Sequence, residues 1–159
     1  MNKRKYKVYL DTSVLSHLWQ LDAPEKMHET LELWDKFKLG GFDVYLSLLT
    51  IDEINGCDKN KLNKVYELLN QIDYTVLDVT SEAQNIADAI VDMNILTQKS
   101  IDDCTHIGVA ISNQLDYIIS WNFKHMVNIK TVNGVRAISL LNKYKTIDIV
   151  APTYFLEEE

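Results

Sequence analysis

The sequence has few cysteines and no long apolar run, and each shortage excludes a class of protein. Among its 159 residues only Cys57 and Cys104 are cysteines, and they form no CxxC pair, so neither a disulfide framework nor a zinc site is expected. The longest apolar stretches, such as 44–49 and 117–121, are far too short to span a bilayer. The first ten residues run into charge and a strand pattern rather than a signal-type apolar region. We therefore expect a cytoplasmic protein without a membrane segment.

The sequence also lacks an excess of basic residues, because its formal net charge is −7. This charge argues against a protein that holds nucleic acid through a broad basic surface. It remains compatible with an enzyme that engages RNA through metal ions and a few local cations. The cations are denser after position 121 than around the acids described below, and for each of them a solvated helix face is an equal alternative: Lys124, Lys130, Arg136, Lys143 and Lys145.

What is present is the composition of one ordinary globular domain, which we expect to span residues 1–159. Hydrophobic residues make up 47% of the chain and aromatics 9%, enough for a real core. Short strand-like segments alternate with helical segments of ordinary length. This alternation predicts an α/β fold, with a mostly parallel central sheet flanked by helices and right-handed crossovers. The strands are expected at 5–10, 44–49, 74–79, 116–121 and 147–150, helices at 14–20, 25–39, 61–71, 81–93 and 135–144, and irregular structure at 123–133.

The segment 100–122 is the most informative part of the chain. It predicts an amphipathic helix, a short polar turn and an apolar strand that stops near Asn122. On the helix, Asp103 shares a face with His106, whereas Asp102 points elsewhere. The apolar centre of the strand is typical of a parallel strand covered on both faces. Ligands of such sheets bind outside the carboxyl ends of the strands, so polar groups at that edge become candidates.

Three acids stand at comparable places in the predicted fold. Asp11 follows the first strand, Glu53 follows the second, and Asp103 heads the helix before the fourth. In a parallel sheet these positions fall at one edge. Two carboxylates about 5 Å apart repel by roughly 3 kcal/mol at an effective dielectric near 20, so a cluster of three favours a bound cation. Oxygen ligands favour Mg²⁺ or Mn²⁺ over zinc, and such ions support hydrolysis of a phosphodiester.

Each acid also has a structural alternative as a helix cap. Asp11 can be the N-cap of the helix that follows it, a place where an acid is common. Glu53 stands three residues after Thr50, and Asp103 three residues after Ser100, which is the spacing of a capping box.

Several stretches together resemble one family. They are YLDTSVLSHL, DDCTHIGVAI and DYIISWNFKHM, with Glu53 after an apolar strand. These stretches resemble PIN-domain ribonucleases, most of all the VapC-type toxins of bacterial toxin–antitoxin pairs, over essentially the whole chain. The strand followed by DTS is a weak motif, whereas the Asp-x-x-His helix followed by a strand ending in SWNFKH is more specific. The resemblance implies a PIN-like fold, hydrolysis of RNA, and metal-binding catalytic roles for Asp11, Glu53 and Asp103.

The resemblance also implies supporting roles for polar residues near these acids. Asn122 falls where many PIN domains have a fourth acid, and its neutral amide argues against a second tightly held metal. Ser13 is expected to support a water on the metal. Lys124 and His125 are expected to meet phosphate or the leaving group, with exposure without function as an equal alternative. His106 is favoured as an orienting or core residue over a ligand.

Two partners follow from the resemblance alone: a cognate antitoxin that blocks the metal site, and a second copy of the chain. The sequence itself shows neither. A partner helix could dock in a groove lined by Trp19, Trp34 or Met27, although core positions are the favoured interpretation for each.

Two other functions stay open. A haloacid-dehalogenase-like phosphatase also carries an acid after its first strand, but its motif needs a second acid where this chain has Ser13. A PIN-like protein that has lost catalysis and serves as a binding or scaffold subunit is the second alternative, and Asn122 is the feature that favours it.

Overall fold

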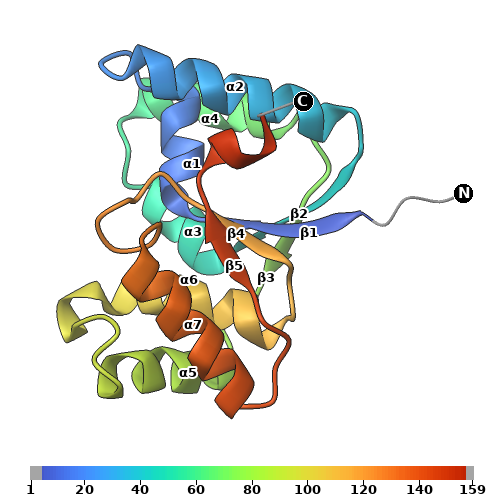
Figure 1. Ribbon diagram of the computed structural model, residues 1–159. Helices are drawn as coiled ribbons and strands as arrows, with labels where there is room; N and C mark the ends of the chain where they lie inside the picture. Colours follow the sequence, from blue (N-terminus) through green and yellow to red (C-terminus); the bar gives the residue numbers. More distant parts are fainter. Residues whose placement is uncertain (1–4, 157–159) are drawn as a thin grey trace, which may run out of the picture.

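The computed structural model describes residues 5–156, in which five parallel strands form one sheet in the order β3-β2-β1-β4-β5 (Figure 1). The central strand β1 pairs with β2 on one side and with β4 on the other. Because every pairing is parallel, all carboxyl ends open on the same edge. This sheet confirms the predicted α/β architecture. The strands are β1 (Tyr6–Leu10), β2 (Phe42–Ser47), β3 (Thr75–Leu77), β4 (Tyr117–Ile119) and β5 (Asp148–Val150).

Helices cover both faces of the sheet, as Figure 1 shows. One face carries α1 (Thr12–Ser16), the 3-10 turn η1 (His17–Trp19), α2 (Pro24–Lys38) and α4 (Lys59–Leu69). The opposite face carries α5 (Ser81–Asp92), α6 (Ile101–Ser112) and α7 (Ile129–Leu141). The short helix α3 (Leu48–Ile54) follows β2 directly and packs beside α1. Two further 3-10 turns are η2 (Gln98–Ser100), which leads into α6, and η3 (Pro152–Phe155), which follows β5.

The side chains of β1 alternate between two apolar cores, as a strand covered on both faces requires. Val8 and Leu10 lie in the core beneath α1, α2 and α4. Tyr9 lies in the other core, with side chains of α5, α6 and α7. Asp11 comes two residues after Tyr9, and its carboxylate emerges where β1 ends.

The largest difference from the predicted elements concerns α7, which was expected at 135–144 after an irregular stretch. The helix begins at Ile129, and Asn128 caps it by accepting a hydrogen bond from the Thr131 backbone at 2.9 Å. The first turn lacks the usual pattern of buried apolar and exposed polar residues, because Ile129 is 81% exposed whereas Thr131 is buried. Periodicity of apolar residues therefore failed to locate the start of this helix.

Within the part of the chain that the structure describes, no helix has both the length and the apolar character needed to cross a bilayer.

Candidate functional site

The strand order reverses between β1 and β4, because β2 and β3 follow β1 on one side while β4 and β5 lie on the other. Such a switch point leaves a crevice at the carboxyl edge, where open α/β sheets bind ligands. Asp11 follows β1 at this point, Glu53 lies in α3, and Asp103 lies in the first turn of α6. The three acids predicted from the sequence are therefore at one edge.

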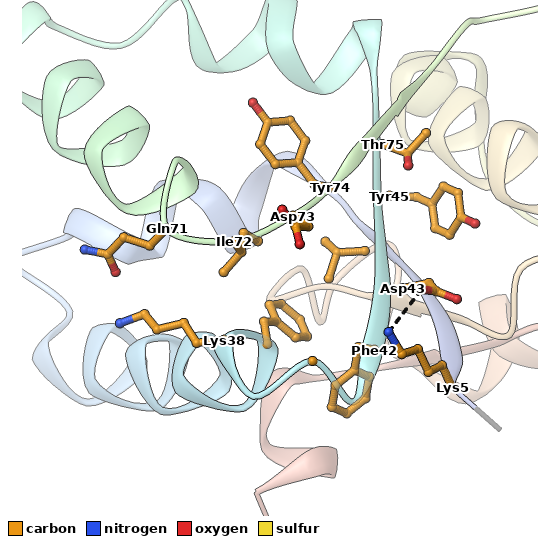
Figure 2. Close-up of a pocket in the computed structure, with 13 residues that line it drawn as sticks. Lys5, Lys38, Phe42, Asp43, Tyr45, Gln71, Ile72, Asp73, Tyr74 and Thr75 are labelled. Atoms are coloured by element: carbon orange, nitrogen blue, oxygen red, sulfur yellow. Dashed lines mark ion pairs between the residues drawn. The ribbon is translucent and has the colours of Figure 1, made fainter. Parts of the chain in front are cut away.

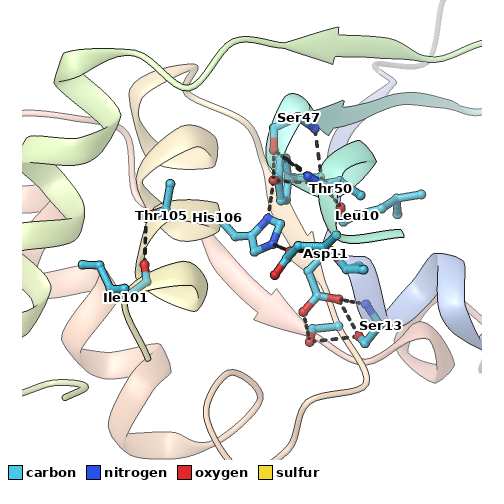
Figure 3. A network of polar contacts seen from close by, with 12 residues as sticks. Leu10, Asp11, Ser13, Ser47, Thr50, Ile101, Thr105 and His106 are labelled. Carbon is cyan, nitrogen blue, oxygen red and sulfur yellow. Dashed lines mark hydrogen bonds and ion pairs between the residues drawn. The ribbon is translucent and has the colours of Figure 1, made fainter. Parts of the chain in front are cut away.

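Asp11 is buried and fully hydrogen-bonded, with only 4% of its surface exposed. Its Oδ1 accepts hydrogen bonds from the Ser13 backbone at 3.0 Å and from the Ser13 hydroxyl (Figure 3). Its Oδ2 accepts one from the Ser120 hydroxyl at 2.6 Å. Burial raises the pKa of Asp11, and the charge of His106 with the bonds from Ser120 and Ser13 only partly opposes this rise. Asp11 is also the N-cap of α1, so the capping interpretation is confirmed as well.

Glu53 is half-buried, and two side chains hold one of its oxygens. Its Oε1 accepts hydrogen bonds from the Thr12 hydroxyl and from His106 Nε2, both at 2.6 Å. A carboxylate only accepts, so Nε2 carries the hydrogen. Burial raises the pKa of Glu53, but the hydrogen bonds from His106 and Thr12 outweigh it and the net pKa lies below the ordinary value. Oε2 accepts no hydrogen bond from any residue in the described range.

His106 is buried on α6 (Figure 3), and its two ring nitrogens connect Glu53 to Tyr9 of β1. Its Nδ1 lies 2.5 Å from the Tyr9 hydroxyl, which also contacts the Ser47 hydroxyl at 2.7 Å and that of Thr50 at 3.3 Å. The ring is thus held at both nitrogens, as expected of a residue that orients Glu53. Tyr9 was not predicted as a site residue, because in the sequence it resembles any other core residue of an apolar strand.

Asp103 differs from the other two acids because it has no donor of its own. Its half-buried carboxylate accepts no hydrogen bond and makes no ion pair within residues 5–156. Burial raises the pKa of Asp103, and the charges of Asp11 and Glu53 raise it further, whereas His106 and His125 lower it. The three carboxylates therefore share one electrostatic neighbourhood.

Neither capping-box interpretation is correct. At the start of α3 the box joins Ser47 and Thr50, whose side chains each accept from the other's backbone N–H at 3.3 Å. The strand β2 ends earlier than expected, so α3 begins at Leu48 and Glu53 lies beyond its first turn. At the start of α6, Ser100 makes no side-chain cap bond, which leaves Asp103 without a capping role.

The acids are neighbours without being a closed metal cage. No three His, Cys, Asp or Glu side chains among the described residues are grouped tightly enough to hold a metal ion. The physical reason is visible in the hydrogen bonds, since Asp11 is turned toward two serines and Glu53 toward His106 and Thr12.

The chemistry of the available donors nevertheless fits a hard cation. The charges of Asp11 and Glu53 act on Asp103, and carboxylate oxygens are ligands that Mg²⁺ and Mn²⁺ prefer. The adjacent Cys104 points into the apolar core instead, where burial together with the charge of Asp103 raises the pKa of its thiol to about 12. A protonated, buried thiol is not a metal ligand.

The side-chain oxygen Oδ1 of Asn122 accepts a hydrogen bond from the His125 backbone at 3.0 Å, within its own turn. Ser120, two residues earlier, contacts Asp11 and also accepts from the Asn122 backbone at 2.9 Å. Ser120 was not predicted as a site residue, since a single serine at the end of an apolar strand forms no distinctive pattern.

Lys124 and His125 line a cavity of about 230 Å³, and the charge of His125 acts on Asp103. Lys130 lines it too, with Thr97 and Asn128 among the neutral side chains, and no carboxylate does. Among the described residues, neither lysine side chain has an ion-pair partner. Of the cations that the sequence placed after the fourth strand, Lys124 and Lys130 line this cavity, whereas Arg136 pairs with Asp148 and Lys145 with Asp116.

A different cavity, of about 320 Å³, opens at the amino end of β2 (Figure 2). Its lining includes Phe42, Asp43 and the segment 71–75, and Lys5 pairs with Asp43 across 4.0 Å. No site residue predicted from the sequence lines this cavity.

Comparison with known proteins agrees with the resemblance found in the sequence. Residues 8–123 match the family model described as PIN domain. No curated protein matches the chain. Among solved structures, it is similar to a chain in the crystal structure of VapBC2 from Rickettsia felis bound to a DNA fragment from their promoter, with 12% identity and a TM-score of 0.56. The alignment covers 91% of this chain and 98% of that one, and at this identity the likeness shows the fold alone.

Proposed function

The chain belongs to the PIN-domain family, and from that premise we propose that it is a metal-dependent endoribonuclease and the toxin of a toxin–antitoxin pair. PIN domains are generally nucleases. The finer statements, which concern RNA as the substrate, Mg²⁺ or Mn²⁺ as the cofactor and the biological role, are our proposal.

The carboxylate of Asp103 is the observation that carries the proposal. It is half-buried, lacks any hydrogen-bond donor in the described residues, and faces the charges of Asp11 and Glu53. Such an arrangement is unfavourable for the protein alone, because burial and like charges both oppose ionisation. It becomes favourable when a divalent cation is shared among the acids. We assign Asp11, Glu53 and Asp103 as the residues that would hold it.

When bound, Mg²⁺ or Mn²⁺ supplies an activated water and stabilises the charge that develops on the phosphate. The chain's own residues orient the acids. His106 and Thr12 hold Oε1 of Glu53 and leave Oε2 available. Ser13, which donates to Asp11 and accepts from the Trp121 backbone at 2.9 Å, fixes the carboxylate at the end of β1.

The cation-lined cavity beside Asp103 favours a polyanionic substrate. Lys124, His125 and Lys130 line it without a carboxylate, although the chain as a whole carries a net charge of −7. We propose that Lys124 and His125 contact the phosphates of RNA next to the bond that is cut. Asn122 would act indirectly, by shaping the turn that presents His125.

An antitoxin protein is the proposed partner, and a homodimer the proposed assembly. The sequence resemblance to VapC-type toxins and the fold shared with a chain of VapBC2 support the antitoxin. Of the residues considered for a docking groove, Trp34 is a core residue, whereas Trp19 and Met27 line a cavity of about 150 Å³ on the surface of α2 and η1. These two are the candidates for contact with the partner.

The decisive experiment is cleavage of a single-stranded RNA oligonucleotide with Mg²⁺, Mn²⁺ or EDTA. The variant Asp103→Asn removes the charge without breaking a protein hydrogen bond, and Asp102→Asn, on the exposed face of the same helical turn, is its matched control. We expect Asp103→Asn to lower the rate by about 100-fold or more, since it removes a metal ligand, and Asp102→Asn to leave it unchanged.

A thermal shift gives a second readout of the same site. Metal should raise the melting temperature of the parent and of Asp102→Asn, but not that of Asp103→Asn. Cleavage that persists in EDTA, or equal activity of the two variants, would overturn the proposal. Metal binding without cleavage would favour a scaffold protein, and turnover of a small phosphomonoester would favour a phosphatase.

A further inference from the structure

An exposed aromatic side chain stands next to the acidic edge. Phe123 follows Asn122 in the loop between β4 and α7, and 48% of its surface is exposed. It belongs to neither apolar core. Burial therefore does not account for a phenylalanine at this position.

The ring of Phe123 rests on a fixed support. Its backbone N–H donates to the Trp121 carbonyl at 3.1 Å. The Trp121 ring meets the phenyl ring edge-on, with the centroids 6.2 Å apart. Trp121 is itself buried, and its Nε1 donates to the Thr30 hydroxyl of α2 at 2.9 Å. The phenyl ring is thus presented by rigid neighbours.

The same support ties the ring to the acids. The Trp121 backbone N–H donates to the Ser13 hydroxyl at 2.9 Å, and that hydroxyl donates to Asp11. Trp121 therefore contacts two partners. Its backbone binds Ser13 of the site, and its ring contacts the ring of Phe123. This arrangement sets the place of the phenyl ring relative to Asp11.

A lysine accompanies the two rings. Lys26 Nζ of α2 lies 5.4 Å from the Phe123 ring centroid and 5.6 Å from that of Trp121. Its ammonium has no carboxylate partner within residues 5–156. The interaction with the rings holds the charge near them without neutralising it.

From these contacts we infer that Phe123 is a stacking platform for an unpaired base of the substrate, and that Lys26 takes an adjoining phosphate. Proteins that bind single-stranded nucleic acids combine an exposed aromatic ring with a nearby cation in this way. A base in a duplex has both faces covered by its neighbours, so it cannot stack on the ring. The inference rests on the proposed ribonuclease function and deepens it, by naming Phe123 as the residue that selects a substrate with an unpaired base at one position.

The test compares kcat/KM for cleavage by the parent, Phe123→Ala and Phe123→Trp. Tyr154→Ala is the matched control, because Tyr154 is an aromatic residue of similar exposure on η3. We expect Phe123→Ala to lower kcat/KM on a single strand by about 5- to 150-fold, the range for loss of one stacked base, mainly through a higher KM. Phe123→Trp should retain the parent value, and Tyr154→Ala should as well.

Two further substrates separate stacking from general loss of affinity. A complementary strand annealed to the RNA should protect it from cleavage by the parent protein. A series of RNA strands, each lacking the base at one position, locates the stacked base. Loss of the base at one position should lower kcat/KM for the parent but not for Phe123→Ala, since the missing base and the missing ring remove the same contact. Lys26→Gln should reduce the salt dependence of log(kcat/KM) by about 0.7 for the single phosphate lost.

The outcomes distinguish this inference from the proposed function. If the parent cleaves RNA but Phe123→Ala matches Tyr154→Ala, or if the duplex is cut as readily as the single strand, stacking on Phe123 is wrong and the ribonuclease function stands. If no missing base produces the selective loss, the inference is equally wrong. If the parent cuts no RNA at all, both fail.

Discussion

The buried hydroxyl of Tyr9 is the atom whose removal best tests how the site is held together. It lies 2.5 Å from His106 Nδ1 and 2.7 Å from the Ser47 hydroxyl, with Thr50 at 3.3 Å. Tyr9→Phe keeps the ring in the core and removes only the oxygen. His106 Nδ1 then loses its partner, whereas Ser47 keeps its contacts with Thr50.

The size of the effect follows from the single group left unpaired. A buried polar atom that loses its hydrogen bond costs about 1–3 kcal/mol of stability. For a chain of this length, that loss corresponds to a melting temperature about 2–12 °C lower. Because His106 also bonds Glu53, we expect cleavage to fall by about 10- to 100-fold, as for other residues that orient metal ligands.

Urea unfolding and cleavage should be measured side by side on Tyr9→Phe and on Tyr66→Phe. Tyr66 is the matched control, since its hydroxyl donates to Asn55 at 3.1 Å near the surface, and its loss should change stability by less than about 0.5 kcal/mol. Equal stability of the two variants would refute the reasoning about the buried hydroxyl. A loss of stability in Tyr9→Phe with normal cleavage would show that the network supports the fold without orienting Glu53.

Three further predictions concern charge and packing. Burial and the charge of Asp11 raise the pKa of Asp103, so its ionisation lowers the stability of the fold as the pH rises through that raised pKa. Asp103→Asn should therefore melt at a higher temperature than the parent at pH 7 in EDTA. A difference in melting temperature that persists at pH 4 would contradict this. The pKa of Glu53 is lowered despite its burial, so ionised Glu53 stabilises the fold above its ordinary pKa, and this stabilisation is lost as the pH falls through the lowered pKa. Glu53→Gln should therefore melt at a lower temperature than the parent at pH 7. An unchanged melting temperature would contradict this. Gly108→Ala would place its Cβ 2.2 Å from the backbone oxygen of Ala83, so urea unfolding should reveal a loss of about 1–3 kcal/mol, which an unchanged midpoint would exclude.

The order of the elements was predictable because each strand is a short apolar run bounded by polar residues. β4 is the clearest case, since Ile118 and Ile119 are both buried, one in each core. Such a strand needs cover on both faces, and that need alone predicts flanking helices and parallel pairing. The start of α7 was not predictable in this way. In its first turn the apolar Ile129 is exposed and the polar Thr131 is buried, which is the reverse of the usual pattern.

The acids could be located from the sequence, but the residues that hold them could not. Asp11 directly follows β1, Asp103 lies in the first turn of α6, and Glu53 lies in the short helix that follows β2. Tyr9 and Ser120 acquire their roles through contacts with His106 and Asp11 that span 97 and 109 positions of sequence. Periodicity reports which residues share a face within one element, and it says nothing about which side chain of a distant element will lie opposite.

Asp11 shows that capping and site chemistry are separate demands on one residue. The cap uses Oδ1, and a serine, threonine or asparagine would satisfy it equally well. A carboxylate that is 4% exposed is a costly way to cap a helix, since burial raises the pKa of Asp11 and its charge raises the pKa of Asp103. The cap therefore explains a polar residue at position 11 but not its charge. A cation shared with Asp103 supplies the missing reason, which is why Asp11→Asn should abolish metal binding, as Asp103→Asn should, while the asparagine still caps α1.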